Sequence, residues 1–412
     1  MVLLHRLRIM QFLQFFLWGS WMVTFPAYAL HKLHFSGSEI GAIYGSMGIV
    51  SLFMPGVIGI IADRWLNKEI LYAILHIIGG VSLLLVSSSV SHQAIFWLLF
   101  VNSSCFMPTI PLGYTIIYVL FSKNQIDKIS QFPKVRVWGT VGFVLAMWLV
   151  SLLHLELSSF QFLLGGSAEL LLGVYALFLP ACKPETKHAA ISLLERFGLK
   201  ALKLFLKPQL AVFFIFSALL GIMLQMSNTW SDAFLHSFDG IPQYADTFAV
   251  HYPGLLFSLS PISETVFILL IPFFLRYFGI KTVMIMSMVA WVIRFSFLAI
   301  GNPADGIWWW IASMLVYGCA FDFFNLSGSL FIELNTSSDV RASAQGLFMM
   351  MVNGVGACLG GFGGGWLVEH YTSAVQNHTN WFPIWMTCAS VAGMMVVVFF
   401  FSFSYRHQNN TL

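Results

Sequence analysis

One carboxylate lies in the middle of a long apolar stretch of the sequence. Residues 255–274 are about long enough to cross a bilayer as one helix, and they contain Glu264. An ionised acid at the bilayer centre costs roughly 2.5 to 3.5 kcal/mol on insertion scales, so Glu264 should face a protein interior or a water-filled cavity. Pro261, one turn earlier, has no N–H and leaves the carbonyl of Phe257 without its intrahelical partner. We therefore predict a broken helix beside an acid, as in transporter ion and substrate sites, with a structural ion pair as the alternative.

Three more ionisable side chains lie in apolar stretches, namely Glu169, Arg294 and Asp322. We expect Glu169 to be a neutral, protonated acid that is hydrogen-bonded to a neighbouring helix. We expect Arg294 to be the structural partner of an acid that the sequence does not identify. Proton coupling needs an acid that keeps its proton when desolvated and releases it near a cation, and Glu264 with Arg136 or Asp322 offers such a set.

Other kinds of chemistry are not indicated. The 5 cysteines include no CxxC pair and the 12 histidines include no HExxH spacing, so we predict no metal site and no cofactor. No nucleophile is paired with a base, which argues against an enzyme. The glycine-rich residues 354–365 lie in an apolar stretch without a following Lys-Ser/Thr pair, so they predict close helix packing rather than a phosphate loop.

The composition is that of a protein that crosses a membrane many times. Of its 412 residues, 58% are hydrophobic and only 9% are charged, whereas soluble domains have about a quarter charged residues. Length and apolarity predict an all-α protein with twelve transmembrane helices. The predicted spans are about 9–30, 39–61, 70–90, 94–121, 136–153, 159–180, 208–231, 253–275, 281–300, 307–333, 341–367 and 382–404.

The distribution of positive charge predicts the orientation. With both termini in the cytoplasm, all of the 20 basic residues except Lys32, Arg136 and Arg294 fall in cytoplasmic segments. The longest polar interval then divides the chain into an N-terminal six-helix bundle (1–180), a cytoplasmic linker (181–207) and a C-terminal six-helix bundle (208–412). Residues 191–205 of the linker have the pattern of a short amphipathic helix, for which joining the two bundles is the simplest task.

A short basic loop after the second span gives the first resemblance to a known family. Residues 59–68 contain Asp63, Arg64 and Lys68 and resemble the signature loop of the major facilitator superfamily, in which such residues link and gate the cytoplasmic helix ends. A similar basic loop recurs after the eighth span, as expected for two pseudo-symmetric halves. The stretches 12–21, 132–143, 317–325 and 340–346 look more specifically like the nucleoside:proton symporter family of that superfamily.

The family resemblance implies a set of site residues. Its substrate-binding positions correspond here to Arg136, Thr140, Phe143, Gln225, Asn228, Glu264, Tyr317 and Phe321. Glu264 and Asp322 are the matched candidates for proton coupling. Planar bases stack on aromatic rings, and ribose hydroxyls need amides and acceptors in a dry pocket, so these residue types suit a nucleoside. Pro261 stands where the family pattern has a glutamine, which leaves the range of nucleosides open.

The resemblance implies a secondary transporter that imports nucleosides with protons by alternating access around a central cavity. Its partners would be a nucleoside, protons and membrane lipid, without nucleic acid, and we expect a monomer in the bacterial inner membrane. The main alternative is a proton-coupled symporter of a sugar or another small polar solute. A receptor or sensor would share the cavity but would need an attached signalling domain.

Overall fold

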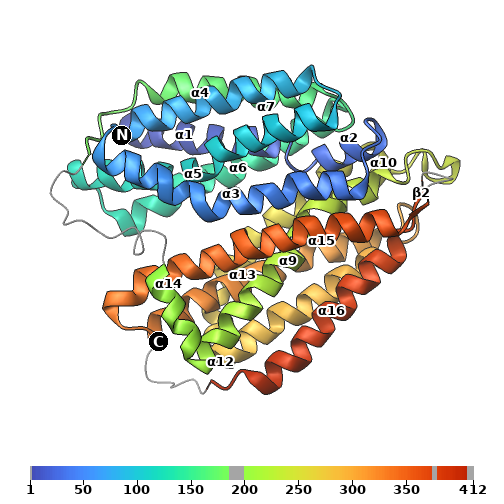
Figure 1. The fold of residues 1–412 in the computed structure, drawn as a ribbon. Helices are drawn as coiled ribbons and strands as arrows, with labels where there is room; N and C mark the ends of the chain where they lie inside the picture. The colour runs from blue at the N-terminus through green and yellow to red at the C-terminus, as the bar shows by residue number, and fades with distance from the viewer. Residues whose placement is uncertain (1, 185–198, 374–377, 406–412) are drawn as a thin grey trace. The chain divides into compact units, whose positions relative to one another are not determined.

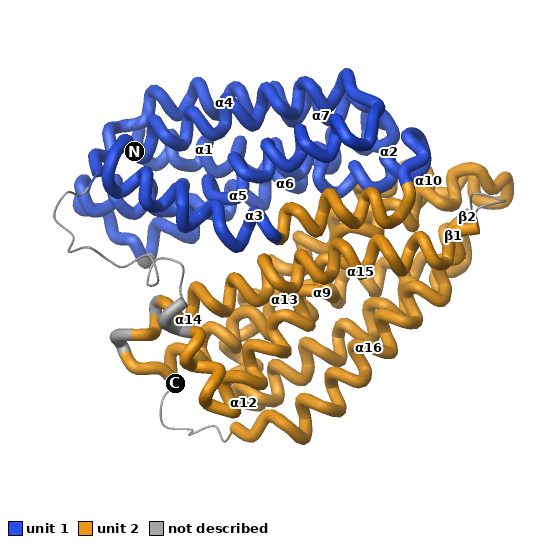
Figure 2. The backbone as a smooth tube through the Cα atoms, viewed as in Figure 1, with its two compact units in different colours: residues 1–35, 49–191 blue, residues 36–48, 192–412 orange. Residues whose placement is uncertain are grey.

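The computed structural model describes residues 2–184, 199–373 and 378–405, and these are almost entirely helical (Figure 1). The described chain divides into two compact units, shown in different colours in Figure 2. We call residues 1–35 and 49–191 the N-terminal unit, and residues 36–48 and 192–412 the C-terminal unit. The first residues of α3, up to Gly48, therefore belong to the C-terminal unit.

The N-terminal unit is built from apolar helices that pack side by side. Helix α4 packs on α5 and α7, and α1 packs on α6 and α7. Its helices are α1 (Val2–Gly19), α2 (Phe25–His31), α3 (Gly37–Arg64, shared as described), α4 (Lys68–Ser87), α5 (His92–Lys123), α6 (Lys128–Leu152) and α7 (Phe160–Ala176).

In the C-terminal unit, α12 packs on α13 and α16, and α9 packs on η3 and α15. Its helices are η1 (Leu199–Leu206), α9 (Pro208–His236), η2 (Pro242–Tyr244), α10 (Phe248–His251), α11 (Pro253–Phe257), α12 (Leu259–Ile300), α13 (Ile307–Asn335), α14 (Ser338–Met350), η3 (Met351–Gly356), α15 (Ala357–His370) and α16 (Trp381–Ser402). A two-stranded antiparallel ribbon, β1 (Thr372–Ser373) with β2 (His378–Thr379), joins α15 to α16.

Nine segments in the described part of the chain are helical, long and apolar enough to cross a membrane. One of them, Pro253–Ile300, covers two predicted spans and breaks at Gly279, whose φ of 73° and ψ of 166° are not helical. The segment Phe160–Ala176 is apolar but shorter. The predicted first span is interrupted by turns at residues 20–24, after which Pro26 lies in the first turn of α2, a position that needs no N–H. Twelve spans therefore stay a prediction.

The glycine-rich stretch packs as predicted. A Cβ atom added to Gly361 would lie 2.3 Å from the backbone nitrogen of Gly45, and one added to Gly365 would lie 2.7 Å from the Cα of Gly41. Both distances are too short for any side chain, so α15 and the first part of α3 touch backbone to backbone. Of the predicted linker helix, residues 191–198 lie outside the described residues, and residues 199–206 form the 3-10 helix η1.

Candidate substrate site

Side chains from three helices of the C-terminal unit meet around Tyr317 on α13, which is 8% exposed. Its hydroxyl donates a hydrogen bond to Oδ1 of Asn228 on α9, at 3.3 Å. Its ring stacks with Phe321, one turn further along α13, with centroids 6.2 Å apart. Glu264 on α12 and the buried Asp322 on α13 are close enough to act electrostatically on the Tyr317 hydroxyl. We call these five residues, together with Arg294, the Tyr317 cluster.

Arg294 is fully buried against the face of the Tyr317 ring. Its Cζ lies 4.7 Å from the ring centroid, a cation–π contact worth about 2 kcal/mol when desolvated. Its Nε donates to Oγ of Ser227 at 2.9 Å, and its Nη1 donates to the carbonyl of Ser313 at 2.8 Å. The prediction that an acid pairs with Arg294 is wrong for the described residues. The guanidinium instead contacts the Ser227 hydroxyl, the Ser313 carbonyl and the Tyr317 ring. A guanidinium tolerates this because it is weakly hydrated for a cation.

Gln225 lies on the same face of α9 as Asn228, one turn earlier. Its Nε2 donates to Oγ1 of Thr229 at 2.7 Å. A small pocket opens between α9, α12, α13, α14 and η3. Its walls are mainly apolar and aromatic, and they include the ring of Phe321. The pocket is lined by Leu220, Leu224, Trp291, Ala320, Phe321, Phe324, Asn325, Phe348 and Val352.

The segment that carries Glu264 stays helical from Pro253 to the break at Gly279. Helix α11 ends at Phe257 and α12 begins at Leu259, but Ser258 between them has helical dihedral angles (φ −61°, ψ −17°), so the predicted broken helix beside the acid is wrong. Pro261 removes only the hydrogen bond to the carbonyl of Phe257, and the backbone around it stays helical. Glu264 is half-buried.

Ser263 fixes this part of α12 against α13, and the sequence did not indicate it. Its hydroxyl donates to the carbonyl of Leu315 and accepts a hydrogen bond from the amide of Gly318, at 3.2 Å. A Cβ at Gly318 would lie 2.6 Å from the carbonyl oxygen of Ser263. The only possible signal was a serine on one span and a glycine on another, and such pairs are frequent in membrane helices.

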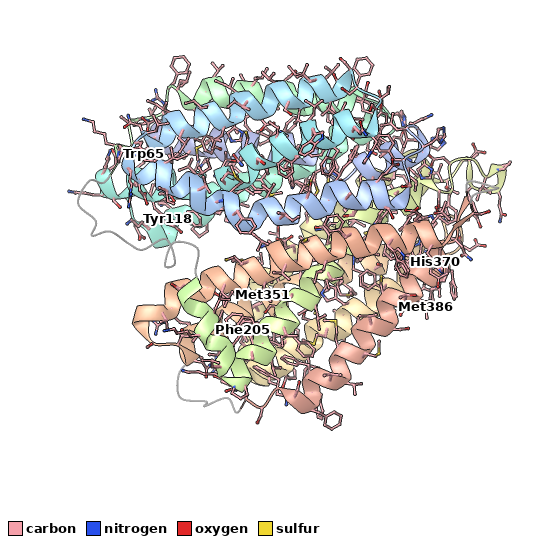
Figure 3. All side chains as sticks on the ribbon, viewed as in Figure 1. Trp65, Tyr118, Phe205, Met351, His370 and Met386 are labelled. Carbon is pink, nitrogen blue, oxygen red and sulfur yellow. The ribbon has the colours of Figure 1, made fainter. Side chains whose placement is uncertain are left out.

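The predicted substrate-binding residues of the N-terminal unit all lie on α6. Because α6 is continuous from Lys128 to Leu152, the spacing of Arg136, Thr140 and Phe143 places them on one helical face. Arg136 is exposed on its unit and acts electrostatically on Tyr118 of α5, which Figure 3 labels. Thr140 and Phe143 are half-buried.

Phe143 also meets α1 at close range. A Cβ at Gly19 would lie 2.7 Å from the carbonyl oxygen of Phe143 and 3.0 Å from its ring carbon Cδ2. The end of α1 therefore holds the ring of Phe143 in place.

The predicted gating residues lie where α3 gives way to α4. Nζ of the buried Lys68 is 4.0 Å from Oδ1 of Asp63, which is about half exposed, and Arg64 is exposed. An ion pair of this length and exposure contributes between 0 and about 1 kcal/mol. Trp65, labelled in Figure 3, is 70% exposed in the same turn.

A second connection at this turn was not predicted. The amide of Cys182 donates to Oε2 of the buried Glu69 at 2.7 Å, and the carbonyl of Cys182 accepts from the amide of Lys68 at 3.0 Å. The segment that follows α7 is thereby tied to the first turn of α4. Burial raises the pKa of the Cys182 thiol to about 11; Glu69 adds to the rise, while Lys123 and Lys68 oppose it.

Glu169 on α7 is fully buried, and the predicted hydrogen bond to a neighbouring helix is confirmed. Its Oε2 accepts from Nδ2 of Asn102 on α5 at 2.9 Å, and its Oε1 lies 3.4 Å from Nδ1 of His76 on α4. Three helices of the N-terminal unit thus meet at one carboxyl group.

Comparisons with known proteins give a consistent result along the whole chain. A family model described as "Nucleoside H+ symporter" matches residues 1–408. The xanthosine permease of Escherichia coli (strain K12) is 48% identical over 404 residues, which cover 98% of this chain and 96% of that protein. The nucleoside permease NupG of the same organism is 44% identical over 403 residues, covering 98% of this chain and 96% of the permease.

Solved structures agree with these comparisons. The crystal structure of the nucleoside transporter NupG matches with a TM-score of 0.93 and 44% identity, covering 98% of this chain and 100% of that one. A bacterial homologue of the human lysosomal transporter Spinster, in an inward-facing conformation, matches with a TM-score of 0.68 and 14% identity, over 98% of this chain and 94% of that one. At that identity the second match shows a shared fold only.

Proposed function

The chain belongs to the nucleoside H+ symporter family, and we propose that the Tyr317 cluster binds the nucleoside that it imports together with protons. The protein is a transporter and not an enzyme, with the all-helical fold of major facilitator transporters, and it crosses the bacterial inner membrane several times. The observation that carries the proposal is the meeting of Asn228, Glu264 and Phe321 at Tyr317.

The residue types around Tyr317 match the two parts of a nucleoside. Phe321 lines an apolar pocket, and a base stacked on such a ring gains roughly 1 to 3 kcal/mol. Asn228 and Gln225 offer amides, and Glu264 offers a carboxylate, for ribose hydroxyls and base edges. We propose that Arg136, Thr140 and Phe143 of α6 also contact the nucleoside.

We propose that Glu264 carries the coupled proton, and that Asp322 is the second carboxylate involved in coupling. Glu264 is half-buried at the start of α12 and acts on the same tyrosine that holds Asn228. A change in its charge would therefore be felt by the nucleoside site. This electrostatic coupling to Tyr317 supports Glu264 as the residue that links the bound proton to the bound nucleoside.

Our proposal also covers the topology, the transport mechanism and the oligomeric state. We propose twelve spans in two six-helix halves (1–180 and 208–412), both termini in the cytoplasm, import by alternating access, and a monomer surrounded by lipid. Asp63, Arg64 and Lys68 then form the cytoplasmic gating loop. Because similar proteins are named as xanthosine and nucleoside permeases, purine nucleosides including xanthosine are the first substrates to test.

The decisive experiment compares accumulation with exchange in liposomes that contain the full chain. We expect Glu264→Gln to keep the shape of the side chain but to lose accumulation of labelled nucleoside driven by an inward proton gradient, while exchange of internal for external nucleoside continues. Asp322→Asn is the matched control for a neighbouring carboxylate. Equal loss of both activities in Glu264→Gln would make Glu264 a binding residue only. Full accumulation in that variant would move the proton site to Asp322.

A further inference from the structure

A buried polar cluster in the N-terminal unit takes no part in the site described above. It joins four helices: α1 through Gln14, α4 through Tyr72 and His76, α5 through Asn102 and Thr109, and α7 through Glu169. None of these side chains is more than 1% exposed. In the part of the chain that the structure describes, the one basic side chain within ion-pair distance of Glu169 is His76.

The direction of the hydrogen bonds fixes the hydrogen on one histidine nitrogen. Thr109 donates its hydroxyl hydrogen to the carbonyl of Phe106 at 2.6 Å, so its Oγ1 accepts from Nε2 of Gln14 at 2.9 Å. The amide of Gln14 therefore turns its Oε1 toward the Tyr72 hydroxyl, which donates to it. Nε2 of His76 lies 2.9 Å from the same Oε1, which can only accept, so this nitrogen carries a hydrogen.

The hydrogen bonds also orient the carboxyl group. Nδ2 of Asn102 donates to the carbonyl of Gly79 at 3.2 Å, and a carbonyl only accepts, so the same NH₂ group donates to Oε2 of Glu169. The other carboxyl oxygen, Oε1, faces Nδ1 of His76 at 3.4 Å. Without a hydrogen between them, two lone pairs would face each other in a fully buried place, next to a carboxylate without a cation.

We propose that His76 and Glu169 together bind one proton and form a second protonation site of this symporter, separate from Glu264 and Asp322. Whether the proton rests on the imidazole or on the carboxyl, the pair is neutral overall, and this neutrality permits its burial. Among the described residues, the other titratable side chains that act on Glu169 or are acted on by it are Tyr72 and Cys105. The proposal rests on the proton-coupled activity: transport requires the pair in its protonated form.

The test combines spectroscopy and uptake on the purified full-length protein. Infrared spectra of wild type and Glu169→Gln reveal whether Glu169 contributes the carbonyl band of a protonated carboxylic acid, and ¹⁵N spectra, with His76→Gln to assign the signal, report which ring nitrogens of His76 carry hydrogen. We expect at neutral pH either the acid band with hydrogen on Nε2 alone, or an imidazolium. A carboxylate facing a neutral histidine would overturn the proposal. These spectra need no transport, so they test the pair even if nucleoside uptake fails.

Uptake decides whether the proton matters for transport. Each protein is normalised to its own maximum across a pH series. We expect wild-type uptake to fall at alkaline pH as the pair loses its proton. Glu169→Gln, which cannot lose one, should keep a larger fraction of its uptake there. Identical pH profiles would show that transport does not use this proton. They would overturn the claim that transport requires the protonated pair. If Glu169→Gln does not fold, the ¹⁵N titration of the wild type, compared with its own uptake profile, decides alone.

Discussion

The Tyr317 cluster makes a quantitative prediction about one hydroxyl group and one ring. Tyr317→Phe removes the hydrogen bond to Asn228 but keeps the ring between Arg294 and Phe321. At 3.3 Å this hydrogen bond is longer than the usual O–H···O range, so its net contribution should be near the lower limit, about 0.5 kcal/mol. That free energy corresponds to roughly a twofold loss of nucleoside affinity, since about 1.4 kcal/mol is tenfold.

Tyr317→Leu is the informative comparison because it removes the ring as well. It loses a desolvated cation–π contact of about 2 kcal/mol and the stacking with Phe321, worth about 0.5 kcal/mol or more. Calorimetric titration with nucleoside in detergent, together with thermal unfolding, should give roughly a sixtyfold or larger loss of affinity or a clear loss of stability. If Tyr317→Phe costs as much as Tyr317→Leu, the hydroxyl and not the ring organises the site.

Three other outcomes are expected. Gly361→Leu should abolish correctly folded protein, measured by size-exclusion chromatography, because its Cβ would lie 2.3 Å from the backbone of α3. The control Gly363→Leu should be tolerated, because a Cβ there has nothing within 4 Å. Equal yields of the two variants would contradict the backbone contact. Cys182 should react slowly with maleimide at pH 7, because its thiol is buried and has a pKa of about 11. Glu69→Ala should speed the reaction. Fast labelling of the wild type would contradict the burial of Cys182 against Glu69. Phe321→Ala should weaken nucleoside binding by about 1 to 3 kcal/mol in the same titration, and unchanged binding would make Phe321 a packing residue.

The helices were predictable because a membrane leaves the backbone few choices. Every N–H and C=O in the bilayer core must be satisfied within the protein, so a long apolar run reads directly as a helix. The same reasoning anticipated the close packing of residues 354–365. It also singled out Glu169 and its hydrogen bond to another helix, since an isolated acid there would be too costly. The broken helix expected before Glu264 is absent, because Pro261 removes one hydrogen bond and the backbone around it stays helical.

The partners of buried charges were not predictable, because they depend on how each helix is rotated. The sequence suggested an acid for Arg294, but the structure supplies Ser227, the carbonyl of Ser313 and a tyrosine ring. Serines and carbonyls occur on every span, so no pattern marks the few that face an arginine. For the same reason, no sequence pattern indicated the hydrogen bond that the amide of Cys182 donates to Glu69.

The break at Gly279 limits how the length of this chain can change. A φ of 73° with a ψ of 166° is accessible almost only to glycine. The two parts of α12 are therefore joined by the single residue Gly279, without a flexible linker. An insertion after Gly279 would turn the following helix by about 100° for each residue added. Such a turn would carry Arg294 away from Ser227 and from the Tyr317 ring.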